Sequence, residues 1–110
     1  MIHEQRQQML QTLNECIQEC EHCYHACLQE EHINMLADCI QLDRECADIC
    51  ALTAKALSRE SYFTKDYLEL CAKICEECGK ECEKHDQHEH CKRCAEACFK
   101  CADACRKAIA

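Results

Sequence analysis

Sixteen of the 110 residues are cysteines, and their spacing follows an α-helical repeat. They fall into four segments in which successive cysteines lie three, four or, once, seven positions apart. The segments contain Cys16, Cys20, Cys23 and Cys27; Cys39, Cys46 and Cys50; Cys71, Cys75, Cys78 and Cys82; and Cys91, Cys94, Cys98, Cys101 and Cys105. Alternating steps of three and four place side chains on one stripe of a helix. Each segment therefore presents one cysteine face.

Seven Cys-x-x-x-Cys pairs occur, at 16/20, 23/27, 46/50, 71/75, 78/82, 94/98 and 101/105, and they leave Cys39 and Cys91 unpaired. Side chains four positions apart are neighbours on a helix, so both sulfurs of a pair can hold one ion. Soft thiolate ligands select Cu(I). The pattern therefore predicts several Cu(I) ions per chain, approaching one per cysteine if each thiolate bridges two ions and about half that number otherwise.

Charge separates Cu(I) from Zn(II) at such sites. When Cu⁺ displaces a thiol proton, one positive charge replaces another, and the buried column stays neutral. A Zn²⁺ ion bound by four thiolates leaves a local charge of about −2, and several such sites stacked in an apolar interior would be costly. A column of thiols therefore favours the monovalent ion.

The elements that carry these cysteines are predicted to be four long helices. Proline is absent and Gly79 is the only glycine, so little interrupts a helical chain. We expect helices over about 3–29, 33–58, 64–84 and 87–108, with Thr64 and Asp86 as N-caps of the third and fourth. Short connections make neighbours antiparallel. The predicted fold class is all-α: one antiparallel, up-down-up-down four-helix bundle with a cysteine-lined core, spanning residues 1–110.

The two ends of this bundle are predicted to differ. Beyond the deepest cysteines the stripes continue into apolar or small residues, which should close that end: Met9, Leu13, Thr53, Leu57, Phe63, Tyr67 and Leu68. At the other end the stripes continue into His32, Met35 and His85, which become candidate copper ligands, and His88 and His90 flank the fourth helix.

Three further polar residues near the cysteine stripes are given no part in metal binding. His22 and His25 point away from the stripe of their helix and are predicted to lie on the surface. Asp43 lies at the edge of the second stripe, where a thiol is missing between Cys39 and Cys46, and Leu42 is the alternative inward residue. The sequence assigns Asp43 no role.

Composition excludes several classes of function. A formal net charge of −8 leaves no basic stripe for nucleic acid or an anionic membrane. No apolar run approaches the roughly 20 residues that cross a bilayer. Residues 1–13 lack the features of an export signal, so we expect a cytoplasmic protein. No general base or oxyanion site accompanies the cysteines, so we expect no enzyme.

With these motifs the chain resembles the bacterial four-helix-bundle copper storage proteins, and specifically their cytosolic branch. The resemblance covers essentially the whole chain and rests on the CxxxC pairs, their distribution over four helices and the histidines near one end. It implies Cu(I) bound inside the bundle by the CxxxC thiolates, uptake through the histidine-bearing end and a homotetramer. The second segment departs from this pattern because it has three cysteines, which leaves Cys39 without a CxxxC partner.

Two other hypotheses use the same cysteines. The chain could be a helical protein stapled by disulfides, similar to the twin CxxxC proteins of the mitochondrial intermembrane space, because many cysteines in a short chain usually form disulfides. It could instead carry Fe–S clusters, but those favour tight CxxC loops. Here the CxxC steps are embedded in a helical repeat. Copper storage is the leading hypothesis.

Overall fold

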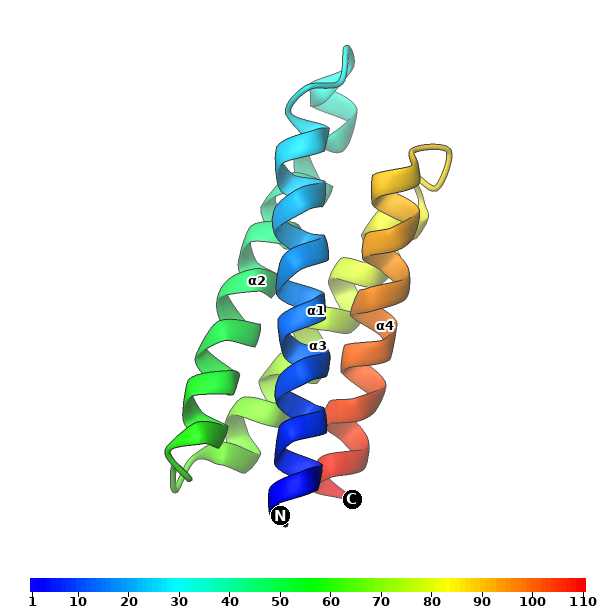
Figure 1. Cartoon of the computed structure of the whole chain (residues 1–110). Helices are drawn as coiled ribbons and strands as arrows, with labels where there is room; N and C mark the ends of the chain where they lie inside the picture. Colours follow the sequence, from blue (N-terminus) through cyan, green and yellow to red (C-terminus); the bar gives the residue numbers. More distant parts are fainter.

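The computed structural model describes residues 1–110 and contains four long helices joined by short connections (Figure 1). They are α1 (His3–Cys27), α2 (Ala37–Ser58), α3 (Thr64–Glu83) and α4 (Glu89–Ile109), and a short 3₁₀ helix, η1 (Ile33–Leu36), precedes α2. Each helix packs on its neighbour in the chain, and α1 packs on α4 to close the bundle. Both termini and the α2–α3 connection lie at one end (Figure 1). The predicted antiparallel four-helix bundle is confirmed.

The predicted helix boundaries need correction at the connections. The second α-helix begins at Ala37 and not at residue 33, because residues 33–36 form a tighter 3₁₀ turn. Thr64 is the first residue of α3 and not its N-cap, since its hydroxyl donates to the carbonyl of Ser61 at 2.6 Å. The N-cap of α4 is His88, two residues after Asp86, and no side chain caps this helix.

Sulfur forms most of the core. All sixteen cysteines have no exposed surface, and the same core contains the buried alanines Ala47, Ala72, Ala95 and Ala102. Free cysteine packs as a small apolar residue. Small side chains let the helices approach closely, so the thiols of all four helices meet along the axis of a bundle that measures 45 × 18 × 17 Å.

Close packing of α3 on α4 depends on the one glycine. A Cβ atom at Gly79 would lie 2.8 Å from Cε1 of Phe99, so the aromatic ring occupies the place of a side chain. Gly79 follows Cys78 directly, and its contact with Phe99 brings the thiols of α3 toward those of α4. The glycine therefore serves the thiol core despite its lower helix propensity.

The end of the bundle that carries the termini is closed by apolar packing. Met9, Leu13, Thr53, Leu57 and Leu68 are buried there, as predicted, and we call these residues the apolar end. The hydroxyl of Thr53 donates to the carbonyl of Tyr67 at 3.5 Å, which satisfies its buried oxygen. Phe63 is 61% exposed, so the prediction that it helps to close this end is wrong.

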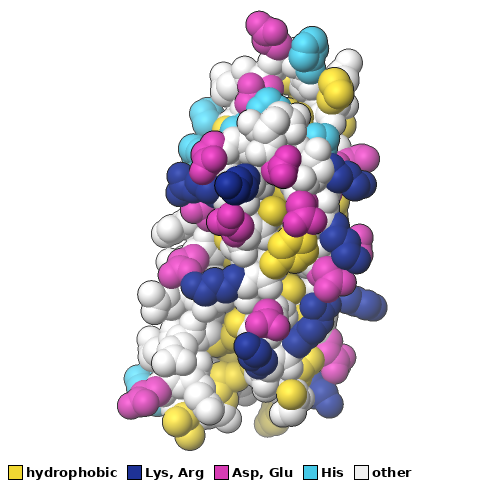
Figure 2. Space-filling model, turned by 90° about the vertical axis from the view of Figure 1, so that its right-hand side faces the viewer, with side chains coloured by type: hydrophobic (Ala, Val, Ile, Leu, Met, Phe, Trp, Pro, Cys, Tyr) yellow, Lys and Arg dark blue, Asp and Glu magenta, His cyan; other side chains and the backbone are white.

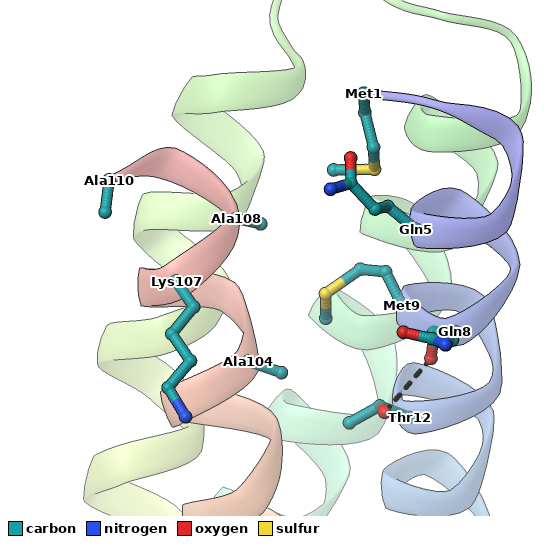
Figure 3. Close-up of a pocket in the computed structure, with 9 residues that line it drawn as sticks. All are labelled: Met1, Gln5, Gln8, Met9, Thr12, Ala104, Lys107, Ala108 and Ala110. Atoms are coloured by element: carbon teal, nitrogen blue, oxygen red, sulfur yellow. Dashed lines mark hydrogen bonds between the residues drawn. The ribbon is translucent and has the colours of Figure 1, made fainter.

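A groove of about 540 Å³ lies outside the apolar end, between the start of α1 and the end of α4 (Figure 3). The nearly buried side chain of Met9 lines this groove, together with polar side chains such as Gln5 and Thr12. No cysteine lines this groove. It is therefore not a route to the thiols.

The surface of the bundle is densely charged on its helix faces, with both signs interspersed (Figure 2). Histidines gather toward the end that carries the α1–α2 and α3–α4 connections, which we call the histidine end (Figure 2). None of the helices combines the length and the apolar character that crossing a membrane requires.

The apolar end supports the stability of the fold without supplying any of the cysteine ligands. Leu13 is fully buried, so Leu13→Ala should lower the free energy of unfolding of the metal-free protein by about 3 kcal/mol. Leu70→Ala is the matched control, because Leu70 is 46% exposed and its loss should cost less than about 0.5 kcal/mol. Chemical denaturation of both variants measures these changes. Equal losses in the free energy of unfolding would contradict the stabilising role of Leu13.

Candidate metal centre

The thiols lie at distances from one another that suit a shared metal ion. Within one helix the Sγ atoms of Cys23 and Cys27 are 3.8 Å apart, and between helices those of Cys46 and Cys75 are 3.5 Å apart. Three thiolates around one ion, with bonds of about 2.3 Å, would be separated by about 4.0 Å. The column is therefore preorganised for ions that bind two or three sulfurs.

The potential ligand groups overlap along the axis. At least four groups of four thiols have all their sulfur atoms within 4.8 Å of one another, among them Cys16/Cys46/Cys50/Cys75, Cys16/Cys20/Cys46/Cys98, Cys20/Cys78/Cys94/Cys98 and Cys50/Cys71/Cys75/Cys101. Within these four groups, six cysteines are shared between two groups: Cys16, Cys20, Cys46, Cys50, Cys75 and Cys98. A sulfur that belongs to two groups can bridge two ions, so the sites form a chain and not a set of separate pockets.

All sixteen thiols are free, and the structure contains no disulfide. Contacts with neighbouring thiols, together with burial, raise the pKa of Cys98 and of Cys50 well above the usual thiol range. Burial disfavours the charged thiolate, and no basic side chain is buried in the core, so the metal-free column is most stable with its thiols protonated and uncharged. Each ion that binds must displace thiol protons.

Cys39 has no CxxxC partner on its own helix and contacts a cysteine on another helix instead. Its Sγ lies 3.3 Å from that of Cys82 on α3, the shortest contact between two sulfurs in the column. The residue four positions after it, Asp43, turns inward and is fully buried, while Leu42 is only partly buried. The missing thiol of α2 is therefore replaced by a carboxyl group from the same helix.

The carboxyl group of Asp43 is surrounded by thiols. Its Oδ1 accepts from Cys94 at 3.3 Å and from Cys78 and Cys82 at 3.4 Å each, and its Oδ2 lies 3.9 Å from Cys39. Burial raises the pKa of Asp43 to about 11, and the nearby thiols of Cys94, Cys39 and Cys78 act in the same direction. Asp43 is therefore neutral at pH 7 and adds no charge to the metal-free core. Helical phase places Asp43 only at the edge of the stripe, and its contacts with thiols of α3 and α4 hold it inside.

At the histidine end, three thiols and one imidazole face one another. The sulfurs of Cys23, Cys27 and Cys91 are 3.8–3.9 Å apart, and His90 Nδ1 lies 3.5 Å from Cys91, 3.7 Å from Cys23 and 3.8 Å from Cys27. An ion at the centre of such a tetrahedron would be about 2.3 Å from its ligands, a typical metal–thiolate bond length. These four residues, which we call the outer site, form a complete ligand set.

Glu30, from the connection after α1, lies against the outer site. His90 Nε2 donates to its Oε2 at 2.9 Å, and His88 Nδ1 lies 3.1 Å from the same oxygen. The hydrogen bond from His90 lowers the pKa of Glu30, so this carboxyl group is ionised at neutral pH. His90 was not among the ligands predicted from sequence, and no role was predicted for Glu30.

The three predicted ligands that are not cysteines lie outside the thiol groups described above and differ in their exposure. His32 and Met35 are exposed, Met35 by 72%, because the 3₁₀ turn and the connection before α2 carry them outward. His85 is half-buried, and its Nε2 is 3.0 Å from a carboxylate oxygen of Glu81 on the same helix. His22 and His25 are on the surface, as predicted.

The fold and this site define a class of protein: a four-helix bundle whose interior is a continuous column of soft metal ligands. The copper storage protein (Csp) family matches residues 2–110, so the match covers nearly the whole chain. The chain therefore belongs to the copper storage protein family. This membership confirms the resemblance seen in the sequence, and it supports the prediction that the protein is not an enzyme.

Individual relatives are similar over most of their length. A Bacillus subtilis (strain 168) protein described as the uncharacterized cysteine-rich protein YhjQ is 51% identical over 81 residues, which are 74% of each chain. The Cu(I)-bound copper storage protein BsCsp3 is 49% identical, with a TM-score of 0.92 over 96% of this chain and 99% of that one. Streptomyces lividans Ccsp, loaded with 10 copper equivalents, is 40% identical, with a TM-score of 0.93 over 96% of this chain and 84% of that one.

The environment of Asp43 makes stability depend on pH. Folded Asp43 keeps its proton up to about pH 11, whereas the unfolded chain releases it near the ordinary value of 3.8. The folded state therefore binds more protons, and its stability should fall by roughly 1.4 kcal/mol per pH unit between pH 5 and 8. Asp43→Asn should remove this slope, as measured by denaturation of the metal-free protein. Parallel pH profiles for the two proteins would show that Asp43 is not buried as a neutral acid.

Proposed function

We propose that the chain stores Cu(I) in bulk, with its sixteen core cysteines as the ligands. The observation that carries this proposal is the overlap of thiol groups along the axis, because one delivery site needs two or three thiols and not a continuous column. Every cysteine is buried, so bound ions would be shielded from water and from other thiols of the cell. Storage accounts for both the number and the burial of the sulfurs.

Uptake is proposed at the histidine end. The outer site is there, and its ligand His90 reaches from the half-exposed start of α4 to buried sulfurs. Met35, His32 and His85 are proposed as outer ligands on the basis of the sequence pattern, and the exposure of Met35 and His32 would let them meet copper before it reaches the column. The apolar end, in contrast, exposes no cysteine to solvent.

A cytoplasmic location and assembly into a homotetramer are proposed as well. Streptomyces lividans has a relative described as a cytosolic copper storage protein, which supports a cytoplasmic location for this chain. Resemblance to the family also suggests a homotetramer. Light scattering on the purified protein tests the assembly, and a monomeric mass at micromolar concentration would rule it out.

An anaerobic Cu(I) titration against a coloured chelator tests storage directly. We expect binding to continue to about sixteen ions per chain if thiolates bridge, and to about eight if they do not. Replacing Cys71 and Cys75 together by serine should remove about two ions. Ser58→Ala, on the exposed end of α2, is the control and should bind as many ions as the wild type. Saturation at one or two equivalents would overturn the storage proposal.

A further inference from the structure

The connection after α1 is held against the outer site by both its backbone and its side chain. The Glu30 N–H donates to the carbonyl of Cys27, a residue of the outer site, at 3.2 Å. The Glu30 side chain reaches α4, where its Oε2 meets the imidazoles of His88 and His90. Those two rings stack, with centroids 5.3 Å apart and planes inclined by 20°. One carboxylate oxygen therefore fixes both rings.

This contact determines which nitrogen of His90 can bind a metal. A carboxylate only accepts hydrogen bonds, so the nitrogen facing it, Nε2, must carry the proton. A neutral imidazole has one N–H, which leaves a lone pair on Nδ1. That atom is the one that lies 3.5–3.8 Å from the three thiols of the outer site. If the Glu30 carboxylate were removed, His90 would lose the hydrogen bond that favours the tautomer in which the Nδ1 lone pair faces the sulfurs.

The geometry points to Glu30 as the positioning residue of the outer site, which holds His90 in the tautomer and orientation that bind Cu(I) as it enters. This inference rests on the proposed storage function. Glu30 is not itself a ligand, because it contacts the nitrogen that faces away from the sulfurs. Carboxylates that accept from a ligand histidine in this way also make the imidazole a stronger ligand, and their loss typically costs about 10–100-fold in metal affinity.

Glu30→Ala should therefore slow the transfer of Cu(I) from a bathocuproine disulfonate complex by about tenfold or more, while the total number of bound ions falls by one at most. Glu30→Gln keeps an amide oxygen that accepts from Nε2, so it should restore most of the rate. Glu31→Ala is the matched control, since Glu31 is the next residue and its exposed carboxylate should have no effect. These rates are measured by stopped flow, as the fall in absorbance of the Cu(I)–bathocuproine disulfonate complex.

Two measurements separate positioning from a general structural effect. In the His90→Ala background, adding Glu30→Ala should produce no further slowing, because Glu30 acts through His90. In the metal-free protein, ¹⁵N chemical shifts of the His90 ring should report the Nε2–H tautomer in the wild type and in Glu30→Gln, and a mixture in Glu30→Ala.

The outcomes distinguish the two proposals. Unchanged rates and an unchanged tautomer in Glu30→Ala would overturn the role of Glu30 while leaving storage intact. Additive slowing in the double variant would overturn it as well. If the wild type takes up no copper, storage fails, and the ring ¹⁵N shifts of the metal-free protein still decide whether Glu30 fixes the tautomer.

Discussion

The rest of the structure depends on one constraint, which is that the interior must hold many metal ligands without holding net charge. Burying an unpaired ion in a protein core is expensive, and a narrow bundle has no room for counterions. Protonated thiols meet the constraint in the metal-free state, and Cu⁺ meets it in the loaded state because each ion replaces a proton. The same exchange with a divalent ion would leave charge behind at every site. The sulfur core therefore stabilises the fold and sets the identity of its cargo.

Two polar side chains enter the column, and each is accommodated within this constraint. Asp43 is buried as a neutral acid among four thiols, so it fills the place of a missing cysteine without adding charge. His90 presents an uncharged nitrogen to the sulfurs, while its proton faces an ionised Glu30 near the surface. Charge is thus kept at the rim of the bundle. The apolar end needs no such arrangement, since the residues that define it are uncharged.

Periodicity in the sequence predicts the helices, their antiparallel order and the inward face of every cysteine, because the repeat of three and four has one helical solution. It does not predict the caps, because these depend on the path of each turn: the Thr64 hydroxyl bonds to the carbonyl of Ser61, and α4 begins only at Glu89, three residues after Asp86. Periodicity also does not predict that the side chains of Asp43 and His90 turn toward the thiols. Helical phase places both at the edge of a stripe, and the decision to turn inward depends on partners from other helices. His32 and Met35 were placed by extending the phase of α2 through residues that form a 3₁₀ turn instead.

Copper is expected to fill the column by replacing thiol protons one for one. The number of protons released per Cu(I) bound, measured in weakly buffered anaerobic solution at pH 7, tests it most directly. We expect one proton per ion throughout the titration, up to about one ion for each of the sixteen cysteines. Release of far less than one proton per ion would contradict it, because the ions would then be bound elsewhere or the core would accumulate positive charge.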